Sequence, residues 1–179
     1  LIAVKIEESD SLIGVGLTDG SDDILLATSN GQAIRFGEQD IRSMGRNSRG
    51  VIGIRLKKDN DKVVSMVVIN DDLPHILTIC ENGLGKRTEV GEYRFQSRGG
   101  SGTINCKITE KNGNVVSVLA VNPDDEIMAV TDRGMMIRTA VDQISIIGRY
   151  TQGVKVISTR ENEIVASIAR IIEPTEKNQ

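Results

Sequence analysis

The sequence predicts an all-β protein assembled from three copies of a structural unit of about 50 residues. One observation behind this prediction is a set of glycines and arginines that recurs at intervals of 52 and then 51 residues. The other is a series of short runs rich in Val and Ile, a composition typical of strands on a buried pleated surface. The recurring positions are Gly31, Gly83 and Gly134; Arg35, Arg87 and Arg138; Arg46, Arg98 and Arg149; and Gly50, Gly102 and Gly153.

The first full copy opens with two short apolar runs, residues 24–28 and 33–36, on either side of Asn30-Gly31. An Asn-Gly pair in this position indicates a β-hairpin, because a type I′ turn needs positive φ at both central residues. A long polar stretch follows and shows no helical periodicity. We then expect a second hairpin, in which Val51–Leu56 pairs with Val63–Ile69.

The later copies repeat this order. Near the N-terminus, Ile2–Ile6 and Leu12–Thr18 match only the second hairpin of a copy. Residues 142–147 (DQISII) fit either a helical turn or a loop that plugs the core. The strands of the third copy are expected at Ile127–Val130, Met135–Thr139, Val154–Ser158 and Ile164–Ile171.

The chain is therefore expected to form one domain with a partial array of propeller-like blades, since four short antiparallel strands per period suit that architecture. WD40 blades carry a Trp-Asp pair and the sequence has no Trp, while kelch blades are richer in aromatic residues than the 2% found here. The expected boundaries are 1–20 for a half repeat, 21–72, 73–124 and 125–172 for full repeats, and 173–179 for a polar tail.

The charges are segregated along the chain, although the formal net charge is only −3. Segments 31–58, 83–107 and 133–155 hold 16 Lys/Arg against 5 Asp/Glu, and the remaining residues hold 6 against 20. If each repeat folds alike, bases line one set of loops and acids line another. Such a basic rim would attract a polyanion, whereas the plainer alternative is that these charges only solvate loops.

The chain lacks the residues of an enzyme or a metal site. His75, the only histidine, lies beside Pro74 and is expected in an exposed turn. No Cys/His cluster has metal-ligand spacing, no phosphate-binding loop occurs, and Asp71-Asp72 and Asp124-Asp125 are interpreted as caps on turns. A protein-interaction propeller is an alternative that would need exposed aromatic or apolar patches.

Three features of the sequence indicate where the protein is located. An apolar run of about 18 residues is absent and so is a signal peptide, so neither a membrane span nor export is predicted. Cys80 and Cys106 lie in apolar strand-like runs and fit a reducing cytoplasm better than a disulfide scaffold. Because Leu1 opens directly inside a strand pattern, we expect the chain to belong to a longer protein.

The stretches that carry a family resemblance are SNGQAIRF, IRSMGRNSRGVIGIRL, DKVVSMVVI, NGLGKRTEVGEY, ITEKNGNVV and QISIIGRYTQGV. In this order they resemble the C-terminal domain of bacterial DNA gyrase A, a β-pinwheel of repeated four-stranded blades. The resemblance covers essentially the whole chain. The corresponding C-terminal domain of topoisomerase IV is the close alternative.

The resemblance implies a domain that wraps duplex DNA around a basic outer rim and guides it for ATP-dependent negative supercoiling. It also implies that the catalytic tyrosine, ATP and Mg belong to other parts of the holoenzyme, so this chain would need no cofactor. The implied partners are double-stranded DNA, the N-terminal core of gyrase A, and gyrase B, which together form a heterotetramer in the bacterial cytoplasm.

The family carries a Gln-basic-basic-Gly-Gly-basic-Gly box in its first blade, and one stretch here resembles it. Serines occupy two of the three basic positions, so we interpret the stretch as a degenerate box from a later blade. Its residues are Gln96, Ser97, Arg98, Gly99, Gly100, Ser101 and Gly102.

The candidate DNA contacts are the arginines held in register by the repeat, with their basic neighbours. Arg suits phosphate because its planar fork donates two hydrogen bonds at once, and nearby glycines would let the backbone come close to the sugar-phosphate chain. The alternative is that these arginines bond carbonyls within loops. The candidates are Arg35, Arg46, Arg49, Lys86, Arg87, Arg98, Arg138 and Arg149, with Arg42 and Arg94 in the same loops.

Overall fold

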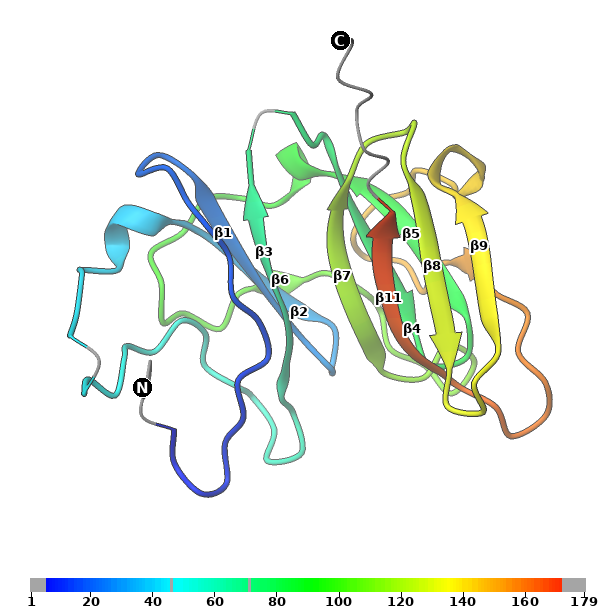
Figure 1. The fold of residues 1–179 in the computed structure, drawn as a ribbon, viewed down its shortest axis with the longest axis horizontal. Coiled ribbons are helices and arrows are strands. Elements are labelled where there is room, and N and C mark those ends of the chain that lie inside the picture. Colours follow the sequence, from blue (N-terminus) through cyan, green and yellow to red (C-terminus); the bar gives the residue numbers. More distant parts are fainter. Residues whose placement is uncertain (1–5, 46, 71, 172–179) are drawn as a thin grey trace, which may run out of the picture.

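The structure is a computed structural model that describes residues 6–45, 47–70 and 72–171. Three antiparallel sheets lie side by side (Figure 1), as the all-β prediction requires. Each sheet has the same inner order, with the last long strand of a repeat paired to its first and the first paired to its second. The strands are β1 (Asp23–Thr28), β2 (Gln32–Gly37) and β3 (Val63–Ile69); β4 (His75–Cys80), β5 (Leu84–Glu89) and β7 (Val115–Val121); and β8 (Glu126–Thr131), β9 (Met136–Ala140) and β11 (Val165–Ile171).

The fourth strand of a sheet is supplied by the following repeat. β6 (Thr103–Ile104) pairs with β2 of the first sheet, and β10 (Val154–Lys155) pairs with β5 of the second. Among the described residues the third sheet has three strands, in the order β11-β8-β9. The repeat is therefore a unit of sequence, whereas a complete blade combines two consecutive repeats.

The predicted second hairpin is wrong. Val63–Ile69 forms β3 but pairs with β1, where Ile69 lies opposite Asp23, and not with Val51–Leu56. The turn between the two runs exists, since the Asp61 N–H donates to the Lys58 carbonyl. The chain leaving that turn pairs with β1 in its own sheet, where β3 buries Val67 and Ile69.

The long loop of each repeat begins with one 3-10 turn that directly follows the second strand. These turns are η1 (Glu38–Asp40), η2 (Val90–Glu92) and η3 (Val141–Gln143). The DQISII stretch thus combines both expected features, a helical turn followed by Ile144, which is buried and plugs the core. Of the expected N-terminal strands, Ile2–Ile6 lies mostly outside the described residues and Leu12–Thr18 forms no strand.

The core lies between the faces of neighbouring sheets. Leu25 and Ile76 belong to the cluster between the first and second sheets, and Leu77 and Ile127 to the cluster between the second and third. Every residue of β4 is buried, because its sheet is covered on both faces. Full burial of one Val, Leu or Ile stabilises a fold by about 1.5–3 kcal/mol, so these aliphatic layers hold the array together.

Glycine is required at the hairpin turns by the strand that the next repeat supplies. Gly31 and Gly83 have φ of 78° and 75°, and a Cβ there would lie 2.2 Å from the Cys106 carbonyl oxygen and 2.1 Å from that of Ile157. Gly134 has the same place in the third copy and a φ of 80°, but nothing lies within 4 Å of its Cβ position.

We expect Gly83→Ala to destabilise the protein more than Gly134→Ala. Both substitutions place an L-residue at positive φ, which costs roughly 1–2 kcal/mol. Only Gly83→Ala also drives a methyl group into the Ile157 carbonyl, and such overpacking adds roughly 1–3 kcal/mol. Urea unfolding followed by circular dichroism measures both losses, and equal losses would contradict the role of close approach.

Candidate nucleic-acid interface

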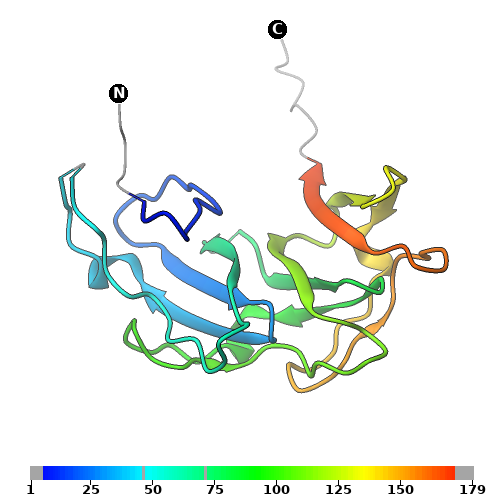
Figure 2. The same cartoon turned by 90° about the horizontal axis from the view of Figure 1, so that it is seen from below.

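The basic segments gather along one side of the molecule, which we call the outer rim. It consists of residues 47–58, 93–107 and 144–157, which include β6 and β10, the outermost strands of their sheets. Figure 2 shows these segments along the lower and left edge, with the N-terminal segment, β3 and β11 on the opposite side. Strand exchange thus brings the basic part of the second and third repeats against the preceding blade.

The second-strand arginines fasten successive repeats. Arg35 on β2 pairs with Asp23 at 2.7 Å and donates from Nη1 to the Val90 carbonyl of the next repeat at 3.2 Å. Arg87 on β5 donates from Nε to the Ile144 carbonyl of the next repeat at 2.6 Å. Arg87, a predicted DNA contact, does not face solvent, because its side chain bonds within this junction and the residue is 6% exposed.

The residue at the start of the first strand decides whether the second-strand arginine has a carboxylate partner in its own repeat. Asp23 and Glu126 pair with Arg35 and Arg138, respectively, and His75 stands in the middle copy. The expected exposed His75 is wrong, since it opens β4 and is buried. Burial and the charge of Arg87 lower the pKa of His75, so the neutral imidazole is favoured.

Lys86, another predicted DNA contact, is fully buried on β5 and does not face solvent. Its Nζ donates to the Gly148 carbonyl at 2.8 Å, to the Arg149 carbonyl, and to the Thr151 hydroxyl at 3.2 Å. Burial lowers the pKa of Lys86 to about 8. The equivalent residues are Ile34 and Ile137, a pattern that indicates an inward-facing position.

Arg98 and Arg149 occupy equivalent junctions. Arg98 donates from Nη1 to the Ile52 carbonyl at 3.1 Å, and Arg149 donates from Nη1 to the Ile104 carbonyl at 2.7 Å. Each arginine therefore bonds a carbonyl of the preceding repeat, as the loop-anchor alternative predicts. Arg46 lies outside the described residues.

The glycines expected to approach DNA also serve the junctions. A Cβ on Gly102 would lie 2.4 Å from the Ala33 carbonyl oxygen, and one on Gly153 would lie 2.8 Å from that of Gly85. These glycines let the exchanged strand approach the neighbouring backbone. Gly50, the equivalent in the first copy, has open space around its Cβ position.

The box-like stretch, residues 96–102, lies inside the junction between the first and second repeats. The Gln96 N–H donates to the Arg35 carbonyl at 2.9 Å, and the Gly99 N–H donates to the Gly53 carbonyl at 2.6 Å. Both serines of the stretch are exposed. Its backbone thus connects two blades.

Exposed cations on the outer rim include two that were not predicted, Arg55 and Lys107. Their spacing of 52 residues was the signal that could have found them. The Arg55 N–H donates to the Gly100 carbonyl and the Lys107 N–H to the Thr151 carbonyl, so the two residues have the same backbone partner position in the next repeat. The other exposed cations in or beside the rim are Arg42, Arg49, Lys57, Lys58, Arg94 and Lys155.

Two of the predicted contact residues, Arg49 and Arg138, keep exposed side chains. Arg49 is 78% exposed in its side chain and lies 3.8 Å from Glu7. Arg138 is half exposed and bonded to Glu126. On the rim, Lys107 Nζ lies 5.9 Å from the ring centre of Tyr150, which is exposed.

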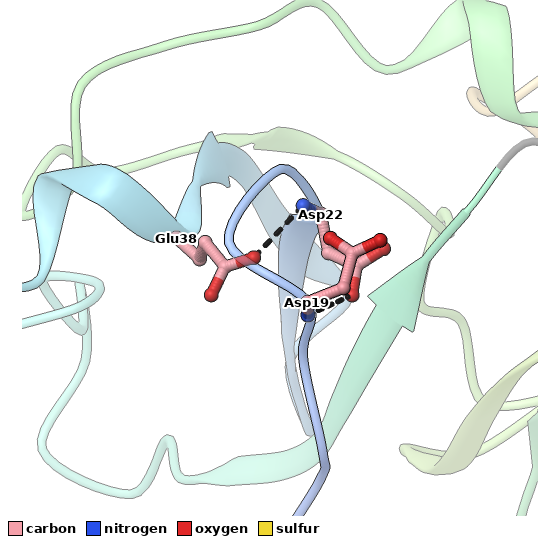
Figure 3. Close-up of side chains that lie close together, drawn as sticks. All are labelled: Asp19, Asp22 and Glu38. Carbon is pink, nitrogen blue, oxygen red and sulfur yellow. Dashed lines mark hydrogen bonds between the residues drawn. The ribbon is translucent and has the colours of Figure 1, made fainter.

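Three carboxylates meet near the start of β1, where Asp19, Asp22 and Glu38 place oxygens within 4.8 Å of one another (Figure 3). They cap a turn, since Glu38 accepts the backbone N–H groups of Gly20 and Asp22. The Ser21 N–H lowers the pKa of Asp19, and the Thr18 hydroxyl lowers that of Glu38. Hydrogen bonds donated within this turn therefore stabilise the negative charge of the three carboxylates.

Sheets stacked face to face and completed by strand exchange define a repeat protein of the β-propeller class. Within the part of the chain that the structure describes, no helix has the length and apolar character to cross a membrane. The family model described as the DNA gyrase C-terminal domain, beta-propeller, matches residues 22–70, 74–122 and 125–172. The chain belongs to this family.

Curated relatives and solved structures agree with this assignment. DNA gyrase A of Escherichia coli (strain K12) is 47% identical over 176 residues, which cover 98% of this chain and 20% of the relative. A structure of the DNA gyrase A C-terminal domain superposes with a TM-score of 0.88 at 28% identity, covering 96% of this chain and 58% of that one. The topoisomerase IV C-terminal domain gives 0.87 at 25% identity, covering 94% and 52%. The chain thus spans about one fifth of its gyrase relatives.

Arg149→Ala is expected to destabilise the fold by about 1.5–3 kcal/mol, because it removes a charge-assisted hydrogen bond and leaves the Ile104 carbonyl without its donor. Arg94→Ala, at an exposed arginine of the neighbouring loop, is the matched control and should stay within about 0.5 kcal/mol. Urea unfolding compares the two variants. An unchanged midpoint for Arg149→Ala would contradict the anchoring role.

Lys86 should make stability rise with pH in the alkaline range. The unfolded chain keeps the lysine proton up to about pH 10.4, whereas the folded chain, with a pKa of about 8, releases it earlier. The folded state then binds fewer protons, so the free energy of unfolding increases with pH between these values. Measured from about pH 7 to 9.5, the wild type should gain stability relative to Lys86→Met. Parallel pH profiles would refute this assignment.

Proposed function

We propose that the outer rim binds duplex DNA through its phosphate backbone. The observation that carries this proposal is the set of exposed cations on the outer rim, above all Arg55 and Lys107 at equivalent places in consecutive repeats. Cations at repeated positions along a curved edge suit a polyanion whose charges are themselves regularly spaced.

Contact with the backbone fits the chemistry of the rim better than base recognition. The described residues include no α-helix that could enter a major groove. Phosphate contacts position a protein without reading sequence, and any preference would come from how easily the duplex bends. Binding is therefore expected to be salt-sensitive and largely indifferent to sequence.

We further propose that this chain acts as the DNA-guiding part of a type II topoisomerase, with bond breakage and ATP hydrolysis supplied elsewhere in the holoenzyme. Family membership and identity to gyrase A proteins support this role and favour gyrase over topoisomerase IV. ATP with Mg and the other gyrase components then belong to the complete enzyme. A protein-interaction role is less well supported, because exposed Phe95 and Tyr150 lie among basic loops.

The double variant Arg55→Ala/Lys107→Ala is expected to weaken binding to a fluorescently labelled duplex. Each phosphate contact contributes about −0.9 to the slope of log K against log salt, so losing both should make the slope shallower by about 1.8. Anisotropy titrations at several salt concentrations, with two unrelated duplex sequences, measure the affinity and the slope.

The matched control is Lys111→Ala/Arg160→Ala, which removes the same charge from exposed residues in the turns before β7 and β11. This control should retain the wild-type slope. Equal losses in the two double variants would mean that only net charge matters, and the rim would then be rejected as the binding site.

A further inference from the structure

Two buried thiols meet inside the second repeat. Cys80 ends β4 and Cys106 follows β6, and their Sγ atoms lie 3.8 Å apart. Cys80 is 0% exposed and Cys106 is 3% exposed, and neither forms a disulfide bond. The second repeat has a neighbouring repeat on each side, so the thiol pair lies away from both ends of the array.

The fold does not require sulfur at either position. The residues equivalent to Cys80 in the first and third repeats are Thr28 and Thr131, and both are buried. The residues equivalent to Cys106 are Ile54 and Ile157, which are also buried. Packing at these two sites is therefore satisfied by Thr and Ile, whereas the second repeat carries a thiol at both sites at once.

The segment that carries Cys106 is held beside the end of β4. Its neighbour Asn105 accepts a hydrogen bond from the Tyr93 hydroxyl at 2.5 Å and bonds the hydroxyl of Thr78, a residue of β4, at 3.2 Å. The Asn105 and Cys106 N–H groups both donate to the Gly31 carbonyl of the first repeat. These bonds fix the backbone around Cys106, so only a small side-chain movement separates the two sulfurs from bonding distance.

The two thiols have different surroundings. The Asn112 side chain donates to Cys106 Sγ at 3.5 Å, and the Cys106 thiol can itself donate to the Thr151 carbonyl at 3.5 Å. The hydrogen bond with Cys80 and the charge of Lys86 lower the pKa of Cys106, whereas the same hydrogen bond and burial raise the pKa of Cys80. Because the thiolate is the reactive form, Cys106 is the sulfur that reacts first, and Cys80 is the thiol placed to resolve it.

We propose that Cys106 and Cys80 form a site of reversible oxidation by hydrogen peroxide, which joins them in a disulfide bond. The Cys106 thiolate attacks one peroxide oxygen and the O–O bond breaks, which leaves a sulfenic acid on Cys106; the departing hydroxide takes up the proton that Cys106 released and becomes water. The Cys80 sulfur then loses its proton, attacks the Cys106 sulfur and displaces hydroxide, which leaves as a second water. Two thiols are thus oxidised to one disulfide while one hydrogen peroxide is reduced to two waters.

A small, uncharged oxidant suits a buried thiol at this place. Cys106 directly follows β6, a strand of two residues with two partners in β2, so little structure has to open locally for a molecule the size of peroxide to enter. The disulfide would tie β4 of the second sheet to the segment that completes the first sheet. It would also close a loop in the unfolded chain, so the melting temperature of the oxidised protein should rise by roughly 5–15 °C.

Oxidation of the folded wild type by hydrogen peroxide tests the proposal. After quenching and unfolding, Ellman's reagent counts the free thiols and mass spectrometry of an unreduced digest maps any link. Both thiols should be lost, Cys80 and Cys106 should be joined within one chain, and dithiothreitol should restore both. Retention of both thiols at a peroxide dose that oxidises the urea-unfolded chain, or a link found only between two chains, would overturn the proposal.

Two variants test the order of the reaction, since Cys80→Thr and Cys106→Ile each introduce the residue found in the other repeats. With circular dichroism confirming that each is folded, Cys80→Thr should accumulate a sulfenic acid on Cys106 that dimedone traps. Cys106→Ile should keep Cys80 as a free thiol under the same treatment. Trapping of a sulfenic acid on Cys80 in folded Cys106→Ile, or none on Cys106 in folded Cys80→Thr, would contradict the assigned roles. The wild-type measurement decides whether the pair forms, even where a variant does not fold.

Discussion

The exchange of a short strand between successive repeats is the constraint on which the rest of the structure depends. Each repeat builds three strands from its own residues, and among the described residues the first two repeats obtain a fourth from the next repeat, through paired N–H groups that donate to the carbonyl of a turn glycine. The exchanged backbone comes so close that a Cβ on Gly31 or Gly83 would overlap a carbonyl oxygen. Glycine periodicity in the sequence therefore records contacts between repeats as well as turns within them.

The same exchange decides what the buried cations do. Strand exchange brings a loop with several free carbonyl groups over the second strand of the preceding repeat, and a buried carbonyl without a donor is costly. Arg87 and Lys86 donate from the second strand to carbonyl groups of that loop, whereas Arg149 donates from the loop to a carbonyl group of the preceding repeat. Lys86 does so without a carboxylate among its hydrogen-bond partners, and burial lowers its pKa.

Much of the fold could be predicted from the sequence, because hairpins joined at Asn-Gly and a period near 50 are local or self-similar signals. The pairing of β6 and β10 with the preceding repeats could not, since pairing across repeats leaves no local trace. The burial of Lys86 could have been predicted by aligning it with Ile34 and Ile137, and the neighbourhood of His75 by aligning it with Asp23 and Glu126. The repeat pattern indicated which arginines have a specific role, but not whether their side chains face solvent or the next blade.

A comparison of the three repeats distinguishes cations that hold the structure together from cations exposed on the surface. Where a guanidinium bridges two repeats, as at Arg98 and Arg149, the residue stays arginine, because the bond geometry needs its planar fork. Where the cation is exposed, the residue varies: Arg55 is replaced by Lys107 and then Ser158, and Arg42 by Arg94 and then Ser145. A phosphate accepts a charge from either Arg or Lys and tolerates its loss at one of several contacts. The proposed DNA-binding rim can therefore vary at these exposed positions without loss of the bonds between blades.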